Sequence, residues 1–154
     1  MTEQHSDVQL LQDPVAVELL GSRELARFAY TWTDGAPRVV PLWFHWTGSA
    51  ITFGTPTGAP KLKVLEQRPD VAVTIDSSST WPYRALLLRG TAAVEMLDRV
   101  SDEYVASAHR YFGEEQGEAW VKGLREKPMA RILMTPTKVS VLDFETRFPS
   151  ALSA

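Results

Sequence analysis

Apolar and polar positions alternate through much of this chain, which is the two-residue period of a β-strand. Phe28, Tyr30 and Trp32 fall on one face of a strand over residues 27–33, and the Asp34-Gly35 pair after it predicts a tight hairpin turn. The same pattern predicts five or six strands within the first hundred residues and a closing strand after them. The remaining strands are expected at residues 38–46, 51–55, 71–76, 83–95 and 130–144.

Helical patterns occupy several of the intervals between these strands. Pro60 suits the first helical position because that residue needs no N–H, and Ser101 is a good N-cap. Trp120 and Leu124 share one face of a later helix. Residues 1–9 are polar and are expected to form a loose tail. The four expected helices cover residues 14–25 (broken near Gly21-Ser22), 60–68, 101–113 and 116–126.

Tight turns and little helix in the first hundred residues favour a small barrel over a parallel sheet. Pro136 interrupts residues 130–144, so the closing strand should be bent or lie at an edge. No repeat or linker divides residues 1–154, and a chain of this length can bury a full core. The predicted fold is a single mainly-β domain, a β-barrel with peripheral helices.

Composition excludes several classes of function. A net charge of −3 argues against nucleic-acid binding as the main activity. The chain has no cysteine, which excludes disulfides and thiolate chemistry, and His5, His45 and His109 lack metal-ligand spacing. No apolar run reaches membrane-span length, and the first ten residues do not resemble a signal peptide. We therefore expect a cytoplasmic protein without a metal site.

The strongest chemical signal is a pair of lysines, Lys61 and Lys63, in the first turn of the helix that begins at Pro60. Cations there oppose the helix dipole, whereas anions are favoured. With the hydroxyls of Thr55 and Thr57 nearby, the pair predicts a phosphate site. The alternative, that both lysines are solvated surface charges, is equally compatible with the sequence alone.

Two residues indicate where a flat ligand would lie. Pro41 removes a backbone donor from the strand over 38–46, which is typical of a strand edge. The strand over 51–55 is interpreted as the partner of the strand over 38–46, and Gly54 leaves it without a side chain at that position. A flat ligand is therefore expected to approach the backbone there. Trp43 supplies either a wall of this site or part of the core, while Phe44 and Trp46 fit the core better.

Motifs for nucleophilic or hydrolytic catalysis are missing. The segment from Gly54 to Lys61 has the wrong spacing for a P-loop, and no GxGxxG sequence follows a strand. His45 fits a strand surface better than a catalytic base. The sequence instead predicts a protein that holds a flat, phosphorylated cofactor, which would carry the chemistry itself.

The order of elements resembles the split-barrel family of pyridoxamine 5'-phosphate oxidase and its deazaflavin-dependent relatives. The matching segments are DGAPRVVPLWF, ITFGT, PKLKVLEQRPDVAVTID and WPYRALLLRGTAAVE, at residues 34–44, 51–55, 60–76 and 81–95. The resemblance implies a split β-barrel of the FMN-binding type that forms a homodimer. It also implies FMN or the deazaflavin F420 as cofactor, and the PLWF segment resembles the F420 branch.

The same resemblance implies a set of cofactor-binding residues. Lys61, helped by Lys63 and Thr55, would hold the cofactor phosphate, and the ring system would lie against the strand that carries Arg38. A second subunit would complete the site. The implied residues are Arg38, Val40, Pro41, Leu42, Trp43, Gly54, Thr55, Lys61 and Lys63 from one subunit and Trp81, Tyr83 and Arg84 from its partner.

The leading hypothesis is therefore an oxidoreductase that passes hydride between F420 or FMN and a small organic substrate. Lys63, Arg84 and Arg89 offer positive charge that could serve the anionic tail of F420. Pro60 stands where pyridoxamine phosphate oxidase has a basic residue, which disfavours that specific reaction. The alternatives are an FMN-binding relative, a non-catalytic flavin- or haem-binding protein, and a small nucleic-acid-binding barrel, which the acidic composition disfavours.

Overall fold

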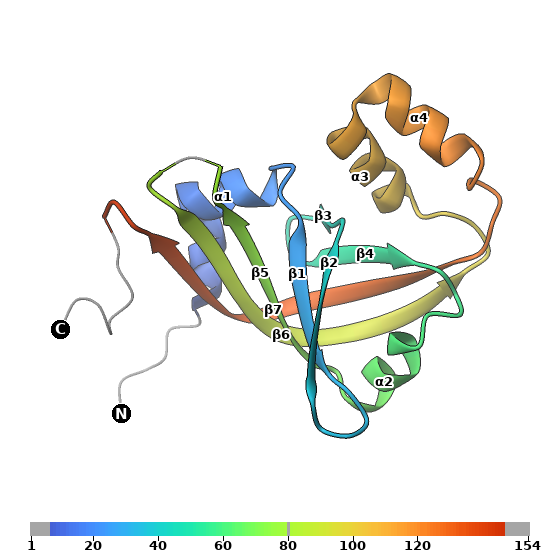
Figure 1. Ribbon diagram of the computed structural model, residues 1–154, viewed down its shortest axis with the longest axis horizontal. Helices are drawn as coiled ribbons and strands as arrows, with labels where there is room; N and C mark the ends of the chain where they lie inside the picture. Colours follow the sequence, from blue (N-terminus) through green and yellow to red (C-terminus); the bar gives the residue numbers. More distant parts are fainter. Residues whose placement is uncertain (1–6, 80, 147–154) are drawn as a thin grey trace.

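One antiparallel sheet of seven strands organises the computed structural model, which describes residues 7–79 and 81–146 (Figure 1). The strand order is β2-β1-β5-β6-β7-β4-β3. The strands are β1 (Ala26–Thr31), β2 (Pro37–Leu42), β3 (His45–Trp46), β4 (Ile51–Thr55), β5 (Asp70–Ser77), β6 (Arg84–Leu97) and β7 (Met129–Asp143). The helices are η1 (Asp7–Gln12), α1 (Pro14–Leu20), α2 (Lys61–Gln67), α3 (Asp102–Phe112) and α4 (Glu114–Lys122).

The sheet curls around a core supplied by the alternating positions. Phe28 on β1 and Phe53 on β4 are fully buried and meet edge to face, with ring centroids 5.1 Å apart. Leu86, Ile132 and similar residues from β6 and β7 fill the rest of the interior. The mainly-β barrel-like fold predicted from the sequence is therefore confirmed, although no hydrogen bonds between described residues join β2 to β3 and close the sheet.

The single strand expected over residues 38–46 is wrong, because the chain leaves the sheet at Trp43 and Phe44. β2 pairs only with β1, whereas β3 pairs with β4 at the other end of the sheet. The physical reason is burial: Phe44 turns fully into the core, and Ser107 Oγ and the Arg110 guanidinium both donate hydrogen bonds to its carbonyl oxygen.

The bend expected at Pro136 is confirmed. The β6–β7 register shifts between Arg89, which faces Lys138, and Gly90, which faces Pro136, so that Thr137 is an extra residue in β7. Such a bulge increases the local bend of a strand. β4 pairs with β7 only over Ala130–Met134, so at Pro136 β7 pairs with β6 alone and the bulge also lies at a local edge of the sheet.

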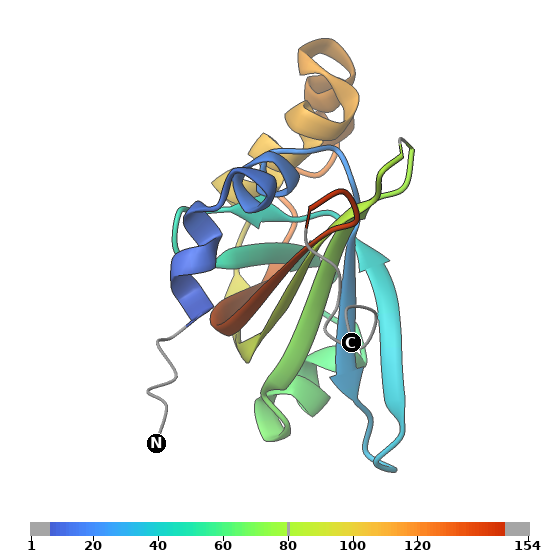
Figure 2. The ribbon, with the colours of Figure 1, turned by 90° about the vertical axis from the view of Figure 1, so that its left-hand side faces the viewer.

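The helices follow the predicted positions with shifted ends. The expected tail extends too far, since Asp7–Gln12 forms η1. α1 ends at Leu20, before the expected break, and α4 occupies Glu114–Lys122 rather than 116–126. Figures 1 and 2 show α3 and α4 together at one end of the curled sheet and α2 at the opposite end. None of the described helices is long and apolar enough to cross a lipid bilayer.

Candidate functional site

The centre of the candidate site is a contact between β4 and α2. β4 ends at Thr55, a short Thr/Gly/Pro loop follows, and α2 begins at Lys61 with Pro60 as its N-cap. The Lys61 Nζ donates a hydrogen bond to Thr55 Oγ1 at 3.2 Å. The Thr55 side chain is buried, so this hydrogen bond holds the Lys61 amine beside the end of the strand.

Partial burial also sets the charge properties of this amine. Desolvation lowers the pKa of Lys61 below its usual value, and no described carboxylate forms an ion pair with it. A partly desolvated cation without an acidic partner gains more from binding an anion than a fully hydrated one does. The geometry therefore fits a phosphate held by Lys61 with Thr55 beside it.

The second lysine does not share this position. Lys63 follows Lys61 by two residues, and a helix turns about 200° over that interval, so the two side chains leave α2 on different sides. Lys63 is exposed and borders a surface cavity with Pro60, Glu66 and Met96. The pair expected from the sequence is therefore one enclosed lysine and one solvated lysine.

The strand predicted to face a ring system is a free edge. In β2, Arg38 and Pro41 are exposed, while Val40 and Leu42 are partly buried against the core. The Arg38 guanidinium lies 5.1 Å from the ring of Trp32. Pro41 thus occupies an edge strand, as its missing N–H predicts.

The predicted role of Gly54 needs correction. Its strand, β4, is not the partner of β2, because β4 pairs with β3 and β7. A Cβ atom on Gly54 would lie 2.6 Å from Tyr104 Cδ2 and 2.8 Å from Met129 Sδ. Tyr104 and Met129 occupy the space directly over its Cα, so close packing explains the glycine, which also borders a cavity between β4 and the helices α3 and α4.

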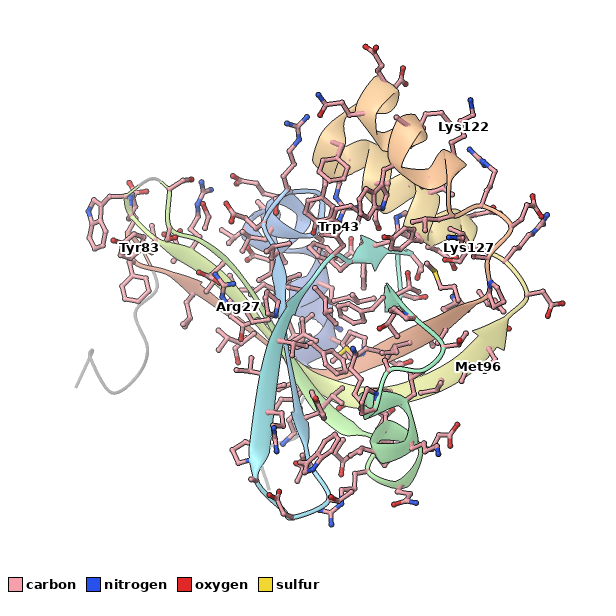
Figure 3. The ribbon with its side chains drawn as sticks, turned by 45° about the vertical axis from the view of Figure 1, so that its right-hand side comes forward. Arg27, Trp43, Tyr83, Met96, Lys122 and Lys127 are labelled. Carbon is pink, nitrogen blue, oxygen red and sulfur yellow. The ribbon has the colours of Figure 1, made fainter. Side chains whose placement is uncertain are left out.

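Trp43 belongs to an aromatic cluster beneath α3 and α4 (Figure 3). Its ring stacks on Tyr111, with centroids 5.2 Å apart and planes inclined by 15°. It also meets Tyr104 at 5.7 Å, Phe112 at 4.9 Å and Trp120 at 6.0 Å. Trp43 therefore joins the strand edge to the helices.

The residues expected from a second subunit lie at the far end of β6. Figure 3 shows Tyr83 at the opposite end of the molecule from Met96, which lies near α2. Trp81 is 71% exposed, and its ring contacts Tyr83 at 4.9 Å. Arg84 forms an ion pair with Glu18 at 2.5 Å. Within one chain these residues cannot reach Lys61.

A polar cluster and a cavity, neither of them predicted from the sequence, lie on the side of β4 that α3 and α4 cover. Three buried polar atoms there have no partner among the described residues: His45 Nδ1, Thr52 Oγ1 and Arg131 Nε. The cavity, about 340 Å³, reaches from Thr55 to Trp120 and Lys127. The sequence signal for the cavity is the spacing of Trp120 and Leu124, which predicts that both lie on one helix face, and both residues line the cavity.

Comparisons with known proteins agree with this fold. An F420 reductase has a similar structure, with 25% sequence identity, a TM-score of 0.62 and coverage of 79% of this chain and 93% of that chain. A conserved hypothetical protein from Mycobacterium tuberculosis is 18% identical, with a TM-score of 0.68 and coverage of 92% and 90%. The haem storage protein HutZ from Vibrio cholerae is 20% identical, with a TM-score of 0.60 and coverage of 84% and 93%.

The sequence comparison identifies the family. No curated protein sequence matches the chain. Residues 13–143, which include every strand and helices α1 to α4, match the family described as pyridoxamine 5'-phosphate oxidase. The resemblance stated from the motifs is thereby confirmed. The chain belongs to the pyridoxamine 5'-phosphate oxidase family.

Proposed function

We propose that this protein is an oxidoreductase that binds F420 or FMN and transfers hydride between that cofactor and a small organic substrate. The single observation that carries the proposal is the enclosed contact between Lys61 and Thr55, at the position where the family resemblance implies the cofactor phosphate. The structural similarity to an F420 reductase, at 25% identity, supports the deazaflavin branch.

The protein's own groups would bind and orient the cofactor. Lys61 would pair with the phosphate, and Thr55 would hold the lysine in place. The exposed edge of β2, from Arg38 to Leu42, would offer backbone groups to the ring system. A bound deazaflavin or flavin would accept or donate the hydride, so the described side chains need only position it.

A second copy of the chain would complete this site. Val39 on β2, 64% exposed, lies beside Ala29 on β1, which in turn faces Ala72 on β5. These small apolar residues lie on the outer face of the sheet, which two-fold symmetry would cover. In such a dimer the partner's exposed Trp81 and Tyr83 would be available to the first subunit's site. We propose a cytoplasmic location for this dimer, as expected from the sequence.

A second candidate is a non-catalytic protein that binds a flavin or haem. The structural similarity to the haem storage protein HutZ favours it. It differs from the oxidoreductase in a measurable way, because a storage protein would hold its ligand without turning over a substrate. The two candidates share the fold, so ligand spectra must separate them.

The test is a set of titrations of the purified protein with F420, FMN and haemin, followed by absorbance and fluorescence. We expect F420 to bind more tightly than FMN at low salt. The difference in affinity should narrow as salt is added, because salt screens the exposed anionic tail of F420. Tight, salt-insensitive FMN binding without F420 affinity would move the protein to the flavin branch. Haemin binding without affinity for either flavin would contradict the proposal.

A further inference from the structure

The cavity between β4 and the helices α3 and α4 is separate from the Lys61 amine, although Thr55 borders both. Its volume, about 340 Å³, is at the small end of the range of ligand pockets. Figure 3 shows Trp43 under the helices that cover this region and Lys127 in the segment that leads from α4 to β7. Nothing in the cofactor proposal uses this space.

The walls of the cavity are aromatic and held in place. The Trp120 indole nitrogen donates a hydrogen bond to the Tyr104 hydroxyl at 3.1 Å, which joins α4 to α3 across the cavity. Trp43 packs behind both rings. Leu124 and Met129 line the same space. A planar, apolar ligand suits these aromatic and aliphatic walls, although Trp120 is itself 49% exposed.

The charge at the cavity is positive. Lys127 lines it, whereas none of the described lining residues is acidic. Lys127, an exposed residue, forms no ion pair with any described residue, so within the described part of the chain its ammonium group has no anionic partner. A ligand with one anionic group would complement the single lysine at the edge of an otherwise apolar space.

We propose that this cavity binds a small aromatic carboxylate, with its ring against Tyr104 and Trp120 and its carboxylate at Lys127. The volume admits a molecule of one or two fused rings. The site stands whether or not a flavin or deazaflavin binds at Lys61. Turnover of the bound acid would make this a substrate site, and binding without turnover would make it a regulatory site.

The experiment is a calorimetric titration of the full chain, without cofactor, with 2-naphthoate as the probe and 2-naphthamide as its neutral counterpart. We expect 2-naphthoate to bind several-fold more tightly than the amide. Lys127→Gln should weaken 2-naphthoate about three- to tenfold, the range for one partly exposed charge contact, and leave the amide unchanged. Lys122→Gln is the matched control, because Lys122 is also exposed but does not line the cavity.

A second measurement locates the probe. In a nitrogen-15 spectrum, addition of 2-naphthoate should shift the indole N–H signal of Trp120, which Trp120→Phe identifies by its loss. Leu124→Trp, which fills the cavity, should abolish binding while the far-ultraviolet circular dichroism stays native. Lys61→Ala should bind 2-naphthoate normally, so failure here is distinguishable from failure of the cofactor proposal. Equal binding by wild type and Lys127→Gln, or an unshifted Trp120 signal, would overturn the inference.

Discussion

Lys61 and Thr55 are six residues apart in the chain, and the hydrogen bond from Nζ to Oγ1 joins the first turn of α2 to the last residue of β4. The bond aligns the amine without neutralising it, because a hydroxyl carries no charge. Burial meanwhile lowers the pKa of Lys61, so the cation is less well solvated than a surface lysine. An anion bound there would compensate the ammonium group for the solvation that it has lost.

Lys61→Ala should weaken cofactor binding by about 1.5–3 kcal/mol, the contribution of one charge-assisted hydrogen bond. Lys63→Ala is the matched control, because Lys63 lies in the same turn but is exposed. Its effect should stay below about 1 kcal/mol. Fluorescence titration with F420 and FMN measures both. Equal losses in the two variants would show that the enclosed lysine has no special role.

The proposed homodimer can be tested through the outer face of β2 and β1. Light scattering at low micromolar concentration should give about twice the chain mass of 17.2 kDa. Val39→Glu should shift the protein toward the monomer, because it places a charge in the proposed interface. Val17→Glu, at a site 55% exposed on α1, should not change the mass. A wild-type monomer that still binds cofactor fully would refute the composite site.

Gly90 should tolerate no side chain. A Cβ atom there would lie 2.0 Å from the backbone oxygen of Thr135, and a backbone atom in a central strand cannot move aside. Gly90→Ala is therefore expected to lower the free energy of unfolding by about 3 kcal/mol. Gly58→Ala has open space around it and should change stability by less than about 1 kcal/mol. Urea unfolding followed by circular dichroism compares the two, and similar midpoints would contradict the packing argument.

His45 should make the fold sensitive to mild acid. Burial and the nearby positive charge of Arg110 lower its pKa below the ordinary 6.5, and Glu103 opposes them only in part. The unfolded chain therefore binds a proton first as pH falls. Stability should decrease below about pH 6.5 and level off once the pH is below the folded-state pKa.

The measurement for His45 is the urea midpoint at pH 7.5 and at pH 5.5. His45→Gln should reduce the difference between the two midpoints, because glutamine does not titrate. The comparison stays above the range in which carboxylates such as Glu118 gain protons. An unchanged difference in the variant would show that other groups cause the acid sensitivity.

Local patterns predicted most of the strands and helices because the evidence for each lies within a few residues. Phe28, Tyr30 and Trp32 alternate on one strand, and Gly113, with φ +84°, does end α3. The family resemblance likewise depended on short motifs. Sequence pattern was therefore sufficient for the fold class and for the contact region around Lys61.

What the sequence could not provide was pairing between distant segments. Residues 38–46 have uniform strand character, so nothing local shows that β2 and β3 separate at Trp43. The neighbours of Gly54 and Trp43 come from α3, α4 and the start of β7, at least fifty residues later in the chain. The cavity beside them exists only when these helices fold onto β4.

The two-residue link between β2 and β3 also ties the two ends of the open sheet together. Three Cα steps from Leu42 to His45 span at most about 11 Å, so the edges of the sheet cannot drift apart. A slip of β2 by one residue would turn its side chains to the opposite face and would also pull Phe44 from the core. A shift in strand alignment at one edge of the sheet would therefore also disturb the other edge. The short link thus couples the two edges, as hydrogen bonds do in a closed barrel.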